Sequence, residues 1–370
     1  MPSDSDYMKR AIELANKGLY SVRKNPRVGC VIVNQDKIVG EGWHQSAGGP
    51  HAEVYALQQA GELAQDATCY VSLEPCVHQG KTPPCAPALI HAKIKRVVIA
   101  TLDPNPLVNS KGVRALRAAG IEVEIGVGAD ESYQLNKGFF KRIESNRPYI
   151  RVKLGASLDG RTALANGASH WITSEPARQD VQYWRARACA ILTSSQTVID
   201  DNPQMNVRDP TVIANIEKLT GLNVLQPYRI VLDAQLRTLP SHQIYQIAGE
   251  VILFTRQDTK ISSNWKGSGV RIIPVPVVNE EMDFLFIMDW LASQEINEIL
   301  VEAGPRLTGA LSQAGLVDEW MIYLAPKFLG PDARPLVQLT ELTDLSQALE
   351  LEYMEYKQIG KDLRIICRLS

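Results

Sequence analysis

At the start of the chain, apolar residues first recur at the spacing of a helix and then occur in strand-like runs. From Ser5, apolar side chains recur at three- to four-residue spacing as far as Leu19, which predicts a helix, and Gly18 is a helix stop signal. The next two runs, VGCVIVN and KIVGEGW, are rich in β-branched residues and flank a polar turn at residues 34–36. Two strand-like runs around a short polar turn predict a β-hairpin.

The rest of the first half alternates helical and strand-like segments. The predicted helices are AEVYALQQAGEL, a segment that begins near Cys85, KGVRALRAAG and DESYQLNKGFFKRIES, and the predicted strands are TCYVSL, RVVIA and IEVEIGV. Alternating elements after an initial hairpin predict an α/β sandwich with a mixed sheet between helices.

The tripeptide NRP at residues 146–148 interrupts this pattern, and we place a domain boundary there, giving domains 1–146 and 147–370. The second half contains strand-like runs, among them YIRVKLGAS, ACAILTSS, YRIVLDA, EVILFT, VRIIPV, EILVEAG, EWMIYLAP and DLRIICRL. An amphipathic helix follows Ser174, and residues 280–292 and 305–314 have helical character. A second α/β domain with a central sheet is therefore expected.

Composition narrows the class of partner. Among 370 residues, 45% are hydrophobic, 22% are charged and the formal net charge is −2, so no overall basic field favours a nucleic acid. No run of 18 apolar residues occurs, and the first residues lack a secretory apolar stretch, so we expect a cytoplasmic protein without a membrane partner. The sequence leaves a homo-oligomer open.

The six cysteines stand at positions 30, 69, 76, 85, 189 and 367. In a reducing compartment, paired cysteines are metal ligands more often than disulfides. Four of the six lie in apolar, strand-like runs, which predicts core positions for them. The other two, Cys76 and Cys85, each follow a proline.

These two cysteines belong to the stretch from Pro50 to Cys85, which carries the strongest chemical signal. His51, Cys76 and Cys85 offer an imidazole and two thiolates, a set that holds Zn²⁺ with a fourth position left for water. Each residue alone would more often be structural, but their order matches the H-x-E…P-C-x-x-C pattern of zinc deaminases, and Glu53 is then placed to carry a proton. Eight residues separate the two cysteines where the general pattern has two, so the segment VHQGKTPP must loop out.

The second half carries weaker signals. The turn at Gly304 follows an apolar strand and precedes a helix, and Gly304 and Gly309 would let the backbone approach a ligand, but the segment lacks a full G-x-G-x-x-G pattern and could be a structural turn. Lys153 inside an apolar strand is costly unless it is paired or functional. Arg185 and Arg208 could bind a phosphate or simply face solvent.

Ten motifs in order resemble one family across nearly the whole length. They are NPRVGCVIV, GWH, GGPHAE, LEPCVHQGKTPPC, DPNPLV, VKLGASLDGRTA, WITS, LTSSQTVIDDNP, VEAGP and APKFLG. This set is similar to that of the bifunctional riboflavin-biosynthesis deaminase/reductases. The resemblance implies a cytidine-deaminase-like α/β/α sandwich followed by a dihydrofolate-reductase-like α/β domain, with Zn²⁺ in the first and NADPH in the second.

The resemblance also assigns roles to residues of the first domain. It implies that His51, Cys76 and Cys85 bind zinc and that Glu53 carries the proton. The substrate positions it implies are Asn25, His44, His78, Lys81 and Asn105. After DPNPLV the family has Gly-Lys-Gly where this chain has Ser110-Lys111-Gly112, which puts the conformation of that loop in question.

In the second domain, the resemblance implies two further sets of residues. The cofactor positions are Ala156, Trp171, Thr173, Thr197, Asp201, Gly304, Pro305, Arg306 and Leu307. The substrate positions are Ser169, Arg185, Met205, Arg208 and Glu302. Lys153 and Asp201 are our candidates for proton handling, while Arg185 and Arg208 could hold a 5′-phosphate.

The implied reactions act on small phosphorylated pyrimidines. The first is hydrolytic deamination of 2,5-diamino-6-ribosylamino-4(3H)-pyrimidinone 5′-phosphate. The second is NADPH-dependent reduction of the ribosyl group of 5-amino-6-(5-phosphoribosylamino)uracil to a ribityl group.

Two rival hypotheses remain open at this point. An RNA-editing deaminase would share the zinc pattern, although the lack of basic excess and the long second half weigh against it. Alternatively, the zinc could be structural and the chain a binding module, which would require a fourth protein ligand, and His78 is the nearby candidate.

Overall fold

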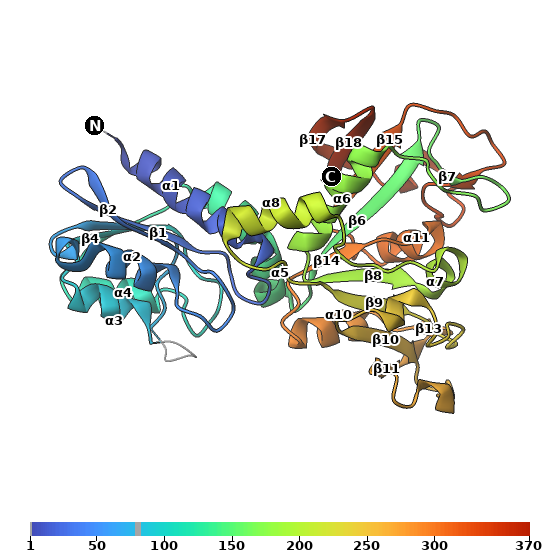
Figure 1. The fold of residues 1–370 in the computed structure, drawn as a ribbon, viewed down its shortest axis with the longest axis horizontal. Helices are drawn as coiled ribbons and strands as arrows, with labels where there is room; N and C mark the ends of the chain where they lie inside the picture. The colour runs from blue at the N-terminus through green and yellow to red at the C-terminus, as the bar shows by residue number, and fades with distance from the viewer. Residues whose placement is uncertain (1, 78–82) are drawn as a thin grey trace. The chain divides into compact units, whose positions relative to one another are not determined.

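The computed structural model describes residues 2–77 and 83–370. The chain forms two compact units (Figure 1). The first comprises the residues up to Asn146 together with Ile216–Val224, and the second comprises Arg147–Asn215 and Leu225–Ser370. Each unit has its own sheet and its own apolar core.

The first unit is built on a five-stranded sheet in the order β2-β1-β3-β4-β5. Its strands are β1 (Gly29–Asn34), β2 (Lys37–Trp43), β3 (Thr68–Leu73), β4 (Arg96–Thr101) and β5 (Glu122–Ile125). β1 runs antiparallel to β2 and β3, whereas β3, β4 and β5 are parallel, so the predicted mixed sheet is confirmed. The predicted hairpin is also confirmed, with Gln35 and Asp36 both at positive φ, as a tight two-residue turn requires.

Helices cover both faces of this sheet. α2 (Ala52–Ala60), α3 (Cys85–His91) and α4 (Lys111–Ala118) share one apolar cluster with β1, β3 and β4. α1 (Asp4–Lys17) packs on the opposite face and contacts α5 (Ala129–Ser145). The short 3₁₀ turns η1 (Gly18–Tyr20) and η2 (Gly61–Ala64) extend α1 and α2. The result is an α/β/α sandwich.

Glycines allow these helices to approach the sheet closely. A Cβ atom on Gly29 would lie 1.9 Å from the carbonyl oxygen of Ala11 in α1. A Cβ atom on Gly42 would lie 2.2 Å from the carbonyl oxygen of Ala52, at the start of α2. Because Ala52 follows His51, the close packing at Gly42 helps to fix the first turn of α2, where two of the predicted site residues stand.

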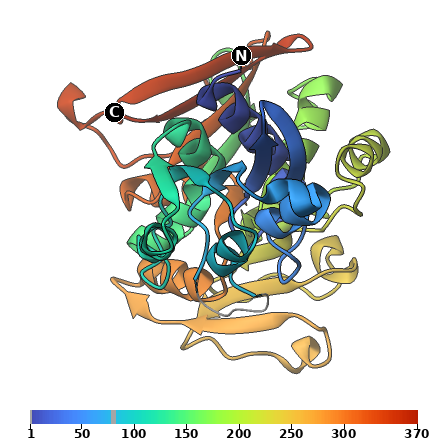
Figure 2. The ribbon, with the colours of Figure 1, turned by 90° about the vertical axis from the view of Figure 1, so that its left-hand side faces the viewer.

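The second unit is built on a nine-stranded sheet in the order β11-β10-β9-β8-β14-β6-β15-β18-β17. Its first seven strands are parallel, and β18 and β17 are antiparallel to their neighbours. The strands are β6 (Tyr149–Ser157), β8 (Ala190–Ser194), β9 (Tyr228–Leu232), β10 (Val251–Arg256), β11 (Arg271–Val275), β14 (Glu298–Val301), β15 (Glu319–Ala325), β17 (Leu351–Ile359) and β18 (Asp362–Leu369). β17 forms one edge of this sheet and belongs to the long red ribbon in Figure 2.

Helices lie on both faces of the larger sheet. α10 (Phe284–Ser293) and α11 (Pro305–Gln313) pack on one face, and α6 (Glu175–Arg187), α7 (Ser195–Asp201) and α9 (Gln243–Gln246) pack on the other. The remaining elements are α8 (Pro210–Thr220), η3 (Ser263–Trp265), η4 (Leu345–Gln347) and the small pairs β7 (Arg161–Ala163) with β16 (Arg334–Pro335) and β12 (Val277–Val278) with β13 (Glu281–Met282).

Some local elements differ from those that the sequence predicts. The helix expected over residues 280–292 is wrong at its start, because Glu281 and Met282 form β13 and the helix begins at Phe284, where the Asp283 side chain caps it. α7 and α8 were not predicted. The four cysteines expected in the core are buried. Among the described helices, none combines the length and apolar character needed to span a membrane.

Candidate functional sites

The predicted zinc ligands come together at the ends of three elements of the first unit. His51 precedes the first turn of α2, Cys76 follows β3, and Cys85 is the first residue of α3. The Nδ1 atom of His51 lies 3.2 Å from the Sγ atom of Cys85 and 3.6 Å from the Sγ atom of Cys76. A tetrahedral zinc ion would hold nitrogen and sulfur ligands roughly 3.6 Å apart, so the donor atoms fit this ion in type and in spacing.

The two cysteine side chains interact with each other. A hydrogen bond with Cys85 lowers the pKa of Cys76 to about 4, and the same bond raises the pKa of Cys85. The backbone N–H of Cys85, at the helix N-terminus, also donates to the sulfur of Cys76. A cation between the two sulfurs would stabilise both as thiolates, which is the electrostatic role that zinc would fill.

Glu53 stands beside this cluster in the first turn of α2. Its side chain is 3% exposed, and its Oε2 atom has no hydrogen-bond partner among the described residues. Burial raises the pKa of Glu53, although the neighbouring His51 acts against that shift. A buried carboxyl group with an unused oxygen next to the metal ligands has the position and the chemistry of a proton carrier.

Two of the predicted substrate residues form a second polar group next to His51. The ring of His44 lies edge-on to that of His51, with 5.3 Å between centroids. Burial lowers the pKa of His44, so its ring is neutral, and its Nδ1–H donates to the carbonyl of Pro50 at 3.0 Å. Its Nε2 therefore accepts from the amide of Asn25 at 3.0 Å, which fixes the orientation of both side chains.

Asn105 lies in the loop between β4 and α4, where its Oδ1 atom accepts the N–H of Leu107. His78 and Lys81, the two other predicted substrate residues, lie outside the described residues. Ser110, where the family pattern has glycine, adopts a positive φ of 59°, a backbone conformation that glycine reaches more easily.

In the second unit, one cavity of about 1340 Å³ gathers nearly all of the predicted reductase residues. It lies at the carboxyl ends of β6, β8 and β14, where open α/β sheets bind ligands. Its lining includes Lys153, Ser169, Trp171, Thr173, Arg185, Thr197, Asp201, Met205, Arg208, Glu302, Gly304, Pro305, Arg306 and Leu307. Ala156 is the exception, since it is fully buried in β6 and is not among the described residues that line the cavity.

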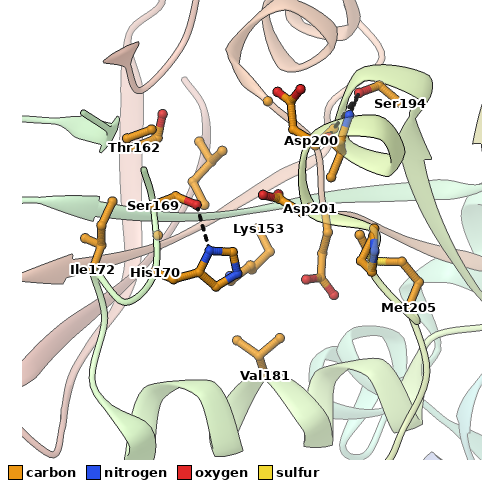
Figure 3. A pocket seen from close by; sticks show the side chains of 18 of the residues that line it. Lys153, Thr162, Ser169, His170, Ile172, Val181, Ser194, Asp200, Asp201 and Met205 are labelled. Atoms are coloured by element: carbon orange, nitrogen blue, oxygen red, sulfur yellow. Dashed lines mark hydrogen bonds between the residues drawn. The ribbon is translucent and has the colours of Figure 1, made fainter. Parts of the chain in front are cut away.

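Lys153 and Asp201 lie near the centre of this cavity, between Ser169 and His170 on one side and Met205 on the other (Figure 3). Burial lowers the pKa of Lys153, while the carboxylate of Glu302 opposes that shift. Burial raises the pKa of Asp201. Both shifts bring the pKa of these groups toward neutrality, the range in which a side chain can exchange protons with a substrate.

Arg185 and Glu302 form a bidentate ion pair in the cavity wall. The Nε and Nη2 atoms of Arg185 lie 2.6 and 2.9 Å from the two carboxylate oxygens, and the side chains are only 9% and 11% exposed. The Nη1 atom of Arg185 donates to the carbonyl of Asn206. Because Arg185 is already engaged, Arg208 is the guanidinium better placed to meet an anion.

The sequence left open whether the turn at Gly304 is a structural turn or a place where a ligand meets the backbone, and the structure supports both. Gly304 caps α11 and lines the cavity. A Cβ atom on Gly304 would meet no other atom within 4 Å, so a ligand could approach the backbone there. The expectation for Gly309 is wrong: a Cβ atom there would lie 1.8 Å from the carbonyl oxygen of Gln338, so this glycine serves packing within the chain.

Several residues of the cavity were not predicted. Gln182 in α6 accepts the backbone N–H of Arg208, and the guanidinium of Arg178 stacks on the ring of Trp171, which is 62% exposed. Arg237 donates to Ser195 and Gln196 at the start of α7. A single polar residue on a helix or in a loop gives no sequence signal of this kind, because the contacts depend on how distant segments fold together.

Comparison with known proteins bears on both units. Residues 1–101 match the cytidine and deoxycytidylate deaminase zinc-binding region, and residues 148–365 match the RibD C-terminal domain. The chain is thus a deaminase joined to a reductase. The zinc-binding region and the His51, Cys76 and Cys85 cluster confirm the predicted zinc cofactor, and the reductase domain is consistent with the predicted NADPH.

Relatives match over the full length. The riboflavin biosynthesis protein RibD of Escherichia coli strain K12 is 50% identical over 97% of this chain and 98% of its own length, and the RibD of Haemophilus influenzae is 44% identical over 98% and 96%. A solved structure of Acinetobacter baumannii RibD has 44% identity and a TM-score of 0.91, covering 99% of both chains. The chain belongs to the RibD family of bifunctional riboflavin-biosynthesis enzymes, and the predicted family, fold class and enzyme class are confirmed.

A more distant solved structure is named for its two activities. The diaminohydroxyphosphoribosylaminopyrimidine deaminase/5-amino-6-(5-phosphoribosylamino)uracil reductase of Thermotoga maritima is 30% identical, with a TM-score of 0.85 and coverage of 99% of both chains. The same two-unit fold therefore persists at an identity below that of the three relatives named above.

Proposed function

We propose that the chain deaminates 2,5-diamino-6-ribosylamino-4(3H)-pyrimidinone 5′-phosphate and then reduces 5-amino-6-(5-phosphoribosylamino)uracil with NADPH. The names of the relatives support these substrates, and the two separate groups of polar residues support two chemical steps. Two thiolate ligands need reduced cysteines, which suits the cytoplasmic location that we also propose.

We assign the first step to a domain of residues 1–146 and the second to a domain of residues 147–370. The metal-ligand cluster lies wholly within the first range, and the residues that line the large cavity lie wholly within the second. The segment Ile216–Val224 lies in the second range by number but belongs to the first compact unit.

For deamination, we assign zinc binding to His51, Cys76 and Cys85, and proton transfer to Glu53. Zinc would supply a water molecule of lowered pKa as the nucleophile. Glu53 takes the proton of the attacking water and returns it to the leaving amino group as ammonia departs, and its burial keeps that proton from bulk solvent. Neutral His44 and Asn25, held by their mutual hydrogen bond, orient the pyrimidinone.

For reduction, NADPH would supply the hydride to the C1′ carbon of the opened ribose. We assign the positioning of its pyrophosphate to the backbone N–H groups at the start of α11, beside Gly304. Lys153 and Asp201 hold and deliver the proton, and Arg208 binds the substrate phosphate. Glu302 holds Arg185 in place through their bidentate ion pair.

The observation that carries the proposal for the first step is the unpartnered, buried carboxyl oxygen of Glu53 beside three convergent metal ligands. The test is Glu53→Gln, which preserves shape and removes the proton carrier. We expect ammonia release to fall by about 100- to 10,000-fold, while NADPH oxidation on deaminated substrate stays at the parent level.

Glu62→Gln is the matched control, because Glu62 is exposed in the same unit and lies outside the metal cluster. If both activities of Glu53→Gln fell together, or if ammonia release fell by less than about tenfold, Glu53 would not be the proton carrier.

A further inference from the structure

Glu74 is a buried carboxylate at the end of β3 that the reaction scheme above does not use. Its side chain is 4% exposed and it stands two residues before the metal ligand Cys76. Its Oε2 atom accepts the backbone N–H groups of Asp103 at 3.3 Å and Ser110 at 3.0 Å. Its Oε1 atom accepts the backbone N–H of Val113 at 3.2 Å. One side chain thus receives three backbone hydrogen bonds from a single distant segment.

These three N–H groups bracket the loop that carries Asn105. Asp103 and Ser110 stand at the two ends of the loop, so one carboxylate oxygen closes it. Within the loop, the Oδ1 atom of Asp103 accepts the N–H of Asn105 at 2.8 Å, and the Oδ1 atom of Asn105 accepts the N–H of Leu107 at 3.0 Å. Among residues 2–77 and 83–370, no partner is recorded for the amide nitrogen of the Asn105 side chain, which can therefore donate to a ligand.

Close packing seats the start of α4 on the same strand end. A Cβ atom on Gly112 would lie 2.1 Å from the carbonyl oxygen of Pro75 and 3.1 Å from the side chain of Glu74. The segment 74–76 therefore contacts the loop and α4 through Glu74 and Pro75, and offers the sulfur of Cys76 to the metal. A shift of the loop relative to this segment would change the distance between Asn105 and the metal.

We propose that Glu74 is a positioning residue of the deaminase, which sets the distance between the substrate contact at Asn105 and the metal ligands. This inference rests on the proposed substrate-binding role of Asn105. A carboxylate suits the task because both of its oxygens accept, whereas the amide of glutamine would direct a donor at one of the backbone N–H groups.

A residue that only stabilised the fold would behave differently from a positioning residue. Loss of a fold-stabilising group lowers the amount of active enzyme and therefore the apparent kcat, with KM unchanged. Loss of a positioning group misplaces the substrate contact and raises KM, because binding is weakened while the metal and Glu53 stay in place. The reductase of the same chain reports the amount of folded protein.

The test is Glu74→Gln, with Glu62→Gln as the control for loss of an acidic charge in the same unit. We expect KM of the deaminase to rise by about 10- to 100-fold with kcat within about threefold of the parent, because charge-assisted hydrogen bonds to the loop are lost. Zinc content per chain and NADPH oxidation should match the parent. In an Asn105→Ala background, Glu74→Gln should add less than about twofold to KM, because the two residues act through one contact.

Two further measurements test the inference in other ways. One uses a different variant, in case Glu74→Gln folds poorly, and the other needs no substrate. Gly112→Ala retains the Glu74 carboxylate but forces the start of α4 away from Pro75 and Glu74, and it should also raise KM. Hydrogen exchange needs no substrate, and Glu74→Gln should speed exchange of the backbone N–H groups of Asp103, Ser110 and Val113 relative to the rest of the unit.

Unchanged exchange at these three groups would overturn the inference, as would a loss of zinc or an equal effect of Glu74→Gln with and without Asn105. By contrast, a parent chain that exchanges as expected but releases no ammonia from the diaminopyrimidinone substrate would count against the proposed function and leave the hydrogen-bonding role of Glu74 standing.

Discussion

The buried ion pair between Arg185 and Glu302 gives a prediction that can be worked out from the structure. Glu302→Gln keeps the shape of the side chain and removes its charge. Both partners are about one-tenth exposed and their contact is bidentate, so the substitution leaves a guanidinium buried without its counter-charge. Breaking such a pair costs about 3–5 kcal/mol, which for a unit of this size lowers the melting temperature by roughly 6–20 °C.

The same substitution should move the pH dependence of the reductase. Glu302 opposes the burial that lowers the pKa of Lys153, so its removal lowers that pKa further. If protonated Lys153 is the donor, activity is lost as the pH rises through its pKa, and this limb of the pH profile should shift to lower pH in Glu302→Gln.

The stability difference should itself depend on pH. Burial alone would raise the pKa of Glu302, but Arg185 lowers it below the usual value. A carboxyl group with a lowered pKa contributes stability that is complete above its unfolded pKa and is lost as the pH falls through its folded pKa. The gap in melting temperature between parent and variant should therefore narrow below about pH 4.

The matched control is Glu352→Gln, which breaks an ion pair with Arg368 whose partners are 55% and 52% exposed. That change should cost less than about 1 kcal/mol. Thermal unfolding followed by calorimetry, together with reductase rates across pH, would test both effects. A Glu302→Gln variant that melts within about 2 °C of the parent, or whose pH limb moves upward, would refute the reasoning.

Three further predictions concern the metal, the phosphate and the core. Removal of zinc with a chelator should abolish ammonia release and leave NADPH oxidation on deaminated substrate unchanged, and metal analysis of the untreated protein should find about one zinc per chain. Arg208→Ala should raise KM of the reductase by roughly 10- to 100-fold for the phosphorylated substrate and leave KM for its dephosphorylated analogue nearly unchanged, as competition assays would show. Gly29→Ala should destabilise the first unit by about 3 kcal/mol, because its Cβ atom would meet the carbonyl of Ala11, and limited proteolysis should cleave that unit first.

The elements of the first unit could be predicted from its sequence because local pattern and tertiary role agree there. The hairpin around residues 34–36 has its turn between two β-branched strands, and α1 presents its periodic apolar residues to the sheet. The metal site could also be predicted, because its ligands occur in a fixed order in the sequence and stand at the ends of helices and strands. Glu74 could not be predicted, because its side chain accepts backbone N–H groups of Asp103 and Val113, which follow it by 29 and 39 positions. Side-chain identities in the sequence do not reveal such backbone contacts.

The second unit was harder to derive from local pattern. α7 begins directly at the end of β8, and its seven residues are too few to establish a helical period. Lys153, Arg185 and Glu302 stand far apart in the sequence and meet only through the order of the sheet, in which β14 lies between β6 and β8. The order of parallel strands is set by crossover connections, so the resemblance to a known family supplied what the spacing could not.

The segment Ile216–Val224 has a practical consequence for anyone who wishes to study either activity alone. Leu222 packs against the apolar cluster of α1 although it lies well past residue 146 in the chain. Dividing the polypeptide after residue 146 would expose the apolar surface that Leu222 covers on the amino-terminal fragment. It would also expose the side chain of Leu222 on the carboxyl-terminal fragment. An amino-terminal fragment should dissolve better if the newly bared patch near α1 is replaced by polar side chains.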